Sequence, residues 1–142
     1  MEVSLRRVRL GGQERVLAVM RDVSQRKRTE AERERLLAIL ERTPDFVGIA
    51  DLQGRALYVN GTTRRLMGFT ADEESRGRLI TSFHPARDAE RLLNEALPAA
   101  QRDGVWIGET ALLASTGAEL PVSQVIMAHK DKQGQVTHYS TI

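Results

Sequence analysis

Three histidines and one short acidic run are the residues of this chain best suited to chemistry. His84, His129 and His138 lack the spacing of a metal-binding motif, and the acidic residues 72–74 fit the solvent-exposed first turn of a short helix. The chain has no cysteine, which excludes disulfides, thiolate nucleophiles, zinc–thiolate sites and cysteinyl-flavin chemistry. Glycine-rich phosphate loops, nucleophile elbows and paired carboxylates are missing from the sequence as well. We therefore predict no catalytic residue and no metal site.

Composition and charge indicate a globular domain of the cytoplasm. The 142 residues are 41% hydrophobic and 28% charged. Residues 1–42 contain eleven Lys and Arg against seven Asp and Glu, whereas residues 43–142 contain ten against twelve. A nucleic-acid-binding protein carries its basic face on the folded domain, so we expect no nucleic-acid partner. The sequence has no signal peptide and no apolar run of the roughly 18 residues that span a bilayer. We expect no membrane contact by this chain. Whether a parent protein has a membrane anchor elsewhere is left open by this sequence.

The first 43 residues predict a hairpin followed by a helix. Residues 3–10 and 15–20 have the composition of strands, and Gly11 and Gly12 favour a tight turn between them. Residues 22–25 have the pattern of a helix start, and Thr43-Pro44 should end the helix near Arg42. The apolar residues of this helix gather in its last two turns: Leu36, Leu37, Ile39 and Leu40. We expect this patch to dock on the following domain or on a second copy; the alternative is a solvated spacer helix.

The rest of the chain predicts an α+β fold. Residues 46–51 and 55–60 are predicted strands, and Asn60 is a suitable N-cap for a helix that ends at Gly68. Residues 86–102 are typical of an amphipathic helix with an apolar face of Ala89, Leu92, Leu93, Ala96 and Leu97, in which Pro98 favours a kink or an early end. Strands are predicted at residues 105–113, 119–130 and 136–142. We expect a five-stranded antiparallel sheet with helices on one face.

Three segments carry a resemblance to a known family. They read DFVGIADLQGRALYVNGTTRRLMGF, HPARDAERL and GVWIGETALLASTGAELPVSQVIMAHKDKQGQV, and in this order they resemble a PAS domain, the PAS/PAC sensory box of bacterial signalling proteins. Residues 3–20 resemble residues 122–142, which suggests that residues 1–21 are the C-terminal hairpin of a preceding PAS domain. The resemblance divides the chain into that hairpin, a connecting helix at residues 22–43 and a PAS domain at residues 44–142 that is truncated in its last strand. We interpret the chain as a piece of a tandem array.

The resemblance implies a sensory or interaction module that is not an enzyme. The parent is expected to be a sensor histidine kinase of a two-component phosphorelay, and a diguanylate cyclase, a phosphodiesterase or another output protein is the alternative. Asp22 and Arg26 lie four residues apart, and by resemblance they form an ion pair that couples the domain core to the connecting helix. The alternative for this pair is an ordinary surface ion pair.

Family topology and strand alternation also suggest a ligand pocket between the sheet and the long helix. The candidate lining residues are Phe46, Ile49, Leu66, Phe83, Leu92, Trp106, Val122 and Ile126, although Trp106 could instead cover the outer face of the sheet. The competing expectation is a ligand-free relay, in which large side chains fill the pocket: Phe46, Phe69, Phe83 and Met127.

The sequence requires no cofactor, and the ligand is unknown. PAS domains that bind haem use a histidine within the long helix; residues 86–102 contain none, which disfavours haem and leaves His84 as the one outside candidate.

The expected partner is a second copy of the chain. A two-stranded hairpin is marginal alone in water, so residues 3–20 should pair with their own domain or with another chain. Alternation along residues 119–130 places Val122, Ile126 and Ala128 on one side of a strand and Pro121, Val125 and Met127 on the other, so both faces of the sheet are partly apolar. We expect a homodimer through the connecting helix, the outer sheet face or both.

Overall fold

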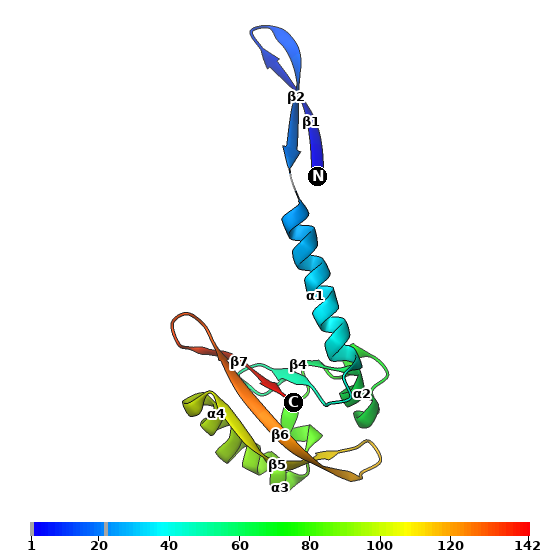
Figure 1. Cartoon of the computed structure of the whole chain (residues 1–142), viewed down its shortest axis with the longest axis vertical. Helices are drawn as coiled ribbons and strands as arrows, with labels where there is room; N and C mark the ends of the chain where they lie inside the picture. The colour runs from blue at the N-terminus through cyan, green and yellow to red at the C-terminus, as the bar shows by residue number, and fades with distance from the viewer. Residues whose placement is uncertain (1, 22) are drawn as a thin grey trace. The chain divides into compact units, whose positions relative to one another are not determined.

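The computed structural model describes residues 2–21 and 23–142 of the chain, which falls into two compact units (Figure 1). The first unit ends at Ile39 and the second comprises Leu40–Ile142. The boundary lies within the last turn of helix α1, Ser24–Arg42, so the end of this helix belongs to the second unit.

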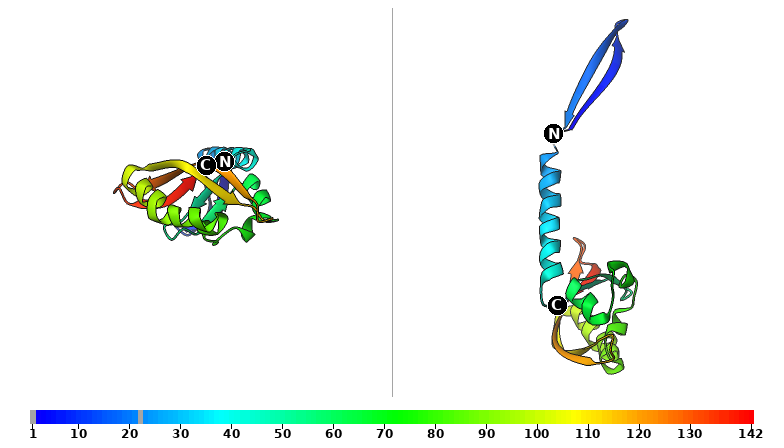
Figure 2. Two further views of the ribbon diagram at one scale, coloured as in Figure 1. Left: turned by 90° about the horizontal axis from the view of Figure 1, so that it is seen from below. Right: turned by 90° about the vertical axis from the view of Figure 1, so that its right-hand side faces the viewer.

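The first unit begins with the predicted hairpin. Strands β1, Glu2–Leu10, and β2, Gln13–Arg21, pair antiparallel from Val3 opposite Met20 to Leu10 opposite Gln13, and Figure 2 shows them side by side. The two-residue turn needs positive φ angles, which Gly11 (57°) and Gly12 (80°) supply.

The hairpin is a separate sheet within the part of the chain that the structure describes. The expected partner of the hairpin, on its own domain or on another chain, stays a prediction. The apolar side chains of the hairpin are about half exposed or more: Val3, Leu5, Leu10, Val16, Leu17, Val19 and Met20.

Helix α1 ends where the sequence predicts, before Thr43-Pro44. It has no buried residue over its described length, because its first turns are almost wholly charged. Leu36, Leu37 and Ile39 are 55%, 49% and 59% exposed, and the expected docking of this patch stays a prediction. Leu40 and Glu41 are partly covered, and they begin the second unit.

The second unit is built on the expected five-stranded antiparallel sheet, as the described residues show (Figure 1). Its order is β4-β3-β7-β6-β5, in which the pair β3–β4 and the three consecutive strands β5–β6–β7 are joined by the β3–β7 ladder. The strands are β3, Gly48–Ala50; β4, Ala56–Val59; β5, Val105–Leu113; β6, Glu119–Lys130; and β7, Val136–Thr141. Burial alternates along β6 as expected, with Gln124 and Ile126 buried between less buried neighbours.

The long helix packs on the inner face of this sheet. It consists of α3, Ala86–Arg91, a π-helical turn η3, Leu92–Ala96, and α4, Leu97–Asp103. Its buried residues join those of the last three strands in one core cluster of Leu92, Ala96, Ala100, Trp106, Ile126 and Tyr139. The predicted early end at Pro98 is wrong, because a proline in the first turn of α4 needs no partner for a backbone N–H group. The long helix is irregular instead at the π-helical turn just before α4. Leu93 is 55% exposed, so it does not belong to the apolar face.

Short elements close the other side of the core. Helix α2, Gly61–Met67, starts at the predicted N-cap Asn60 and ends at Gly68, whose φ is 75°. The 3-10 turns η1, Asp72–Glu74, and η2, Ile80–Phe83, follow. A second buried cluster contains Ala56, Val59 and Phe83, with Met67 and Phe69 packed against it.

Candidate ligand cavity and helix anchor

A cavity of about 410 Å³ lies within the second unit. This volume is in the range of small-molecule sites in proteins. Its wall includes six of the eight residues predicted from the sequence: Phe46, Ile49, Phe83, Leu92, Val122 and Ile126. Two of the four side chains expected to fill the space, Phe46 and Phe83, instead line it. Phe69 packs edge-on against Phe83 with ring centroids 6.2 Å apart, and Met127 is outside the described lining.

Trp106 and Leu66 lie outside the cavity lining that the described residues form, which corrects the sequence prediction. The indole of Trp106 lies over Gly108, where a Cβ atom would come within 2.4 Å of the ring. Because Gly108 has no side chain, Trp106 fills the core beneath the long helix, and the guanidinium of Arg91 lies 5.3 Å from its ring centroid. Leu66 is only partly buried in α2, and its carbonyl accepts a hydrogen bond from the amide of Ser115.

Hydrogen bonds between side chains of three strands reach the cavity wall at Gln124 and Thr141. The hydroxyl of Thr110 on β5 donates to Oε1 of Gln124 on β6 at 2.7 Å, and Nε2 of Gln124 donates to Oγ1 of Thr141 on β7 at 3.0 Å. Gln124 is 6% exposed, and these bonds fix which end of its amide carries the N–H groups. The sequence analysis missed Gln124, whose position between Val122 and Ile126 on the inward side of β6 was the available signal.

His84 is the second polar group of the wall that the sequence analysis did not place in the pocket. Its ring is 7% exposed, and Nδ1 lies 2.8 Å from the carbonyl oxygen of Ala111. Burial disfavours the charged imidazolium and lowers the pKa of His84 from its ordinary value, although the carbonyl of Ala111 and the carboxylate of Asp88 partly oppose this effect. His84 lies just before the long helix, as expected from the sequence. Its place in the cavity wall is an additional feature that the sequence analysis did not predict.

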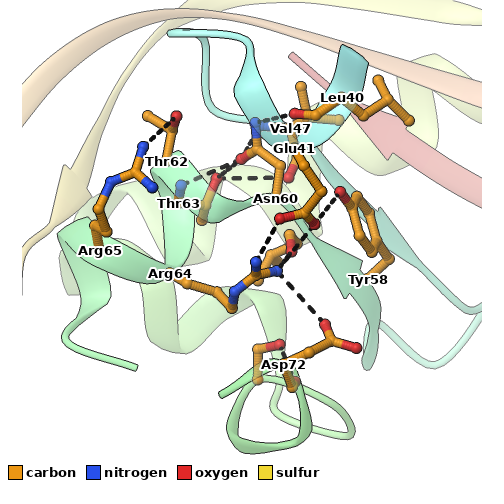
Figure 3. Close-up of polar contacts among 12 residues, drawn as sticks. Leu40, Glu41, Val47, Tyr58, Asn60, Thr62, Thr63, Arg64, Arg65 and Asp72 are labelled. Atoms are coloured by element: carbon orange, nitrogen blue, oxygen red, sulfur yellow. Dashed lines mark hydrogen bonds and ion pairs between the residues drawn. The ribbon is translucent and has the colours of Figure 1, made fainter. Parts of the chain in front are cut away.

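Asn60 ties the cavity wall to the end of α1 (Figure 3). Its Oδ1 accepts from the amides of Val47 and Thr63 at 3.1 Å each and from the hydroxyl of Thr63 at 2.7 Å. Its Nδ2 donates to the carbonyl oxygens of Leu40 and Asp45, both at 2.9 Å. The side chain is fully buried and every polar position on it is used, so its geometry is tightly determined.

An ion pair holds the same end of α1 from the other side (Figure 3). Glu41 receives two bonds from Arg64, at 2.5 and 3.2 Å, and a third from the hydroxyl of Tyr58 at 2.6 Å. The bonds from Arg64 hold the pKa of Glu41 below its ordinary value, and burial raises the pKa of Tyr58. Gly61 allows the close approach, because a Cβ atom there would lie 3.1 Å from the carbonyl oxygen of Glu41.

The cavity and the anchor share three residues, of which Asp45 accepts a hydrogen bond from Nδ2 of Asn60 through its carbonyl oxygen. Val47 and Thr63 both line the cavity and both bind Oδ1 of Asn60. A displacement of this wall must therefore change the hydrogen bonds of the side chain that holds the carbonyl of Leu40. The sequence analysis recognised Asn60 as a helix cap but missed this second role, since nothing local indicates that residues 40 and 60 meet.

The pair expected to couple the core to the connecting helix is not placed by the structure. Asp22 lies outside the described residues, and Arg26 is exposed on α1. Their ion pair stays a prediction, and the side chains described above that bind the end of α1 are Asn60, Tyr58 and Arg64.

No group of three or more His, Asp or Glu side chains in residues 2–21 and 23–142 has the arrangement to hold a metal ion. His129 and His138 stack with ring centroids 4.5 Å apart on neighbouring strands. None of the described helices combines the length and the apolar character that crossing a bilayer requires.

Comparison with known proteins identifies the family. The family model described as the PAS fold matches residues 34–141. A PAS domain from Colwellia psychrerythraea superposes with a TM-score of 0.70 at 20% identity, covering 78% of this chain and 92% of the other. A PAS domain of an HTR-like protein from Haloarcula marismortui gives 0.70 at 23% identity over 85% and 97%. A PAS domain from a two-component sensor histidine kinase gives 0.63 at 12% identity over 80% and 94%.

A search of curated proteins finds no significant match. The fold and its cavity define a sensory and signalling domain, and the chain belongs to the PAS family. The α+β fold expected from the sequence is confirmed.

Proposed function

We propose that this chain is a sensor whose cavity occupancy alters the anchoring of α1. The observation that carries the proposal is the double role of Val47 and Thr63, which line the cavity and bind Asn60. A ligand that prefers one arrangement of this wall shifts the population of that arrangement by its differential affinity. A difference of about 3 kcal/mol changes the ratio of two states roughly 150-fold.

The parent protein in this proposal is a sensor histidine kinase, with α1 as the connecting helix. The support is the likeness in fold to a PAS domain from a two-component sensor histidine kinase. A cyclic-di-GMP enzyme or a transcriptional regulator is the alternative output, and a PAS domain of a LuxR-family transcriptional regulator from Burkholderia thailandensis is also similar in fold.

A homodimer is part of the same proposal. Leu36, Leu37 and Ile39 form an exposed apolar patch on α1, and Ile107 on the outer sheet face is 66% exposed. Burial of these surfaces against a second copy stabilises the dimer by roughly 25 cal/mol per Å² of apolar area. This exposed patch also favours the second candidate function, a ligand-free relay that works through dimerisation alone.

The N-terminal hairpin completes the domain organisation that we propose. Its exposed apolar side chains and its likeness in sequence to the β6–β7 hairpin support its origin in a preceding PAS core. In that arrangement, strands of the preceding core would cover the hairpin and pair with its edges.

The proposal is tested by backbone hydrogen exchange of the intact chain with and without a cavity probe, for which 4-propylphenol is suitable. We expect binding to change the exchange of residues 40–43 and of the Val47 and Thr63 amides by about fivefold or more. Binding that changes exchange only in β6 and β7 would contradict the proposed link to α1.

A further inference from the structure

We propose that the cavity takes an uncharged, mostly hydrocarbon molecule with one hydroxyl or N–H group, which donates a hydrogen bond to Nε2 of His84. The inference rests on the proposed sensory function and defines the chemical class of the ligand. It stands on the wall composition, on the hydrogen bond at the other ring nitrogen and on the burial of the ring.

The tautomer of His84 follows from its neighbour. A carbonyl oxygen can only accept, so the 2.8 Å contact with Ala111 requires a proton on Nδ1 of His84. In the neutral ring, Nε2 is then a hydrogen-bond acceptor. Burial favours this neutral ring.

The acceptor Nε2 belongs to a residue of the cavity wall. Among the described residues none is recorded as a partner of Nε2, and this atom is not among the fully buried unsatisfied ones, so it retains contact with open space. His84 belongs to the cavity wall, and the proposal places the open side of Nε2 toward the cavity. A ligand with a donor at this point removes the cost of an unpaired acceptor.

Charge at the wall excludes ionic ligands. Asp45 alone is charged among the described lining residues, and it lies at an exposed position. A buried carboxylate or phosphate needs a cationic partner, and a buried ammonium needs an anionic one. The wall therefore selects against nucleotides, flavin phosphates and fatty carboxylates, and its apolar residues favour a hydrocarbon body.

Gln124 is a further polar side chain of the wall. Thr110 occupies one lone pair of Oε1, and Thr141 occupies one hydrogen of Nε2. The amide therefore retains one donor and one acceptor position. A ligand with a single donor and no charge can satisfy His84 and leave Gln124 to its two threonines.

Three matched probes test the inference by calorimetric titration of the intact chain. They are 4-propylphenol, which has a donor; 4-propylanisole, which has the same body without a donor; and 4-propylbenzoate, which is anionic. We expect the phenol to bind about tenfold more tightly than each of the others. Equal binding of phenol and anisole, or tightest binding of benzoate, would overturn the inference.

His84→Asn isolates the acceptor. The Nδ2 group of asparagine can retain the bond to the carbonyl of Ala111, and the variant lacks an atom at the position of Nε2. We expect the phenol to lose about three- to tenfold in affinity while the anisole is unchanged. A His84→Gln variant, which places a polar group near the Nε2 position, should recover part of the loss. Unchanged phenol affinity in His84→Asn would overturn the role of His84.

The two levels of the proposal fail differently. If anisole binds as well as phenol and still changes hydrogen exchange at residues 40–43, the sensory function stands and the ligand class is wrong. If the phenol binds with the expected preference and residues 40–43 do not respond, the ligand class stands and the sensory coupling is wrong. If none of the three probes binds, both the ligand class and the sensory function are overturned.

Discussion

The side-chain amide of Asn60 donates to the carbonyl oxygen of Leu40 at 2.9 Å, which joins the first turn of α2 to the last turn of α1. The same side chain accepts from Val47 and Thr63 of the cavity wall. One buried residue therefore links the cavity to the connecting helix, and each prediction below tests a part of this arrangement.

Asn60→Ala should lower the free energy of unfolding by roughly 3 kcal/mol, because it removes a helix cap and leaves buried backbone groups without partners. Urea unfolding of the second unit, followed by Trp106 fluorescence, measures the change. The control is Gln53→Ala in an exposed turn, for which a change below about 0.5 kcal/mol is expected. Equal effects of the two substitutions would show that the Asn60 network does not stabilise the domain.

Glu41→Gln should weaken the contact between the end of α1 and the domain, and it should remove the contribution of Glu41 to the pH dependence of stability. The pKa of Glu41 is lowered in the folded chain from 4.5, so its contribution is present above that pH and is lost as the pH falls through the folded value. The ion pair is partly exposed, and we expect no more than about 1 kcal/mol. Unfolding at pH 7 and below pH 4.5 measures the difference, with Glu34→Gln on the exposed part of α1 as the control.

His84 should make the domain less stable in mild acid. Its pKa in the folded chain is below the ordinary 6.5, so the unfolded chain binds the proton more readily. The stabilisation is therefore complete above pH 6.5 and is lost as the pH falls through the folded value. Thermal unfolding from pH 8 to pH 5 should show a shallower slope for His84→Asn than for the native chain.

His138→Asn is the control for that slope, because the pKa of His138 is lowered in the same direction by burial and by the nearby His129. Its ring is more exposed, so its effect should be the smaller one. A slope unchanged by His84→Asn would contradict the neutral, buried imidazole.

The proposed dimer should depend on the apolar patch of α1. A double substitution, Leu36→Glu with Leu37→Glu, places charges where a second copy would pack, and should weaken self-association by about tenfold or more. Sedimentation equilibrium measures it. Leu57→Glu on β4, where the leucine is 49% exposed, is the matched control. A dimer that Leu57→Glu disrupts and the double substitution leaves intact would place the interface elsewhere.

Local sequence signals were sufficient for most elements of the fold. Asn60 and Gly68 mark the two ends of α2, because helix capping depends only on the residues next to the helix end. The hairpin turn at Gly11-Gly12 likewise depends only on its own two residues. Alternation along β6 identified Val122 and Ile126 as inward-facing because one face of that strand is buried.

Contacts between distant segments could not be predicted in this way. The ring of Trp106 lies over Gly108, which has no side chain, and therefore lies outside the cavity lining. Strand alternation cannot predict this position. The π turn at Leu92–Ala96 shifts the helix register, and hydropathy does not record it. The tie between Asn60 and Leu40 and the bond between His84 and Ala111 join residues far apart in sequence, so only the folded chain reveals them.

The most direct test of the central claim is the NMR signal of the Asn60 side-chain amide in the intact chain, titrated with 4-propylphenol. We expect this signal and the backbone amide of Glu41 to shift together with those of the cavity wall. The Thr63→Val variant, which loses the hydroxyl bond to Asn60 and keeps the shape of the side chain, should bind the phenol and show a smaller shift at Glu41. A saturated cavity with unchanged Asn60 and Glu41 signals would contradict the claim that occupancy is transmitted to α1.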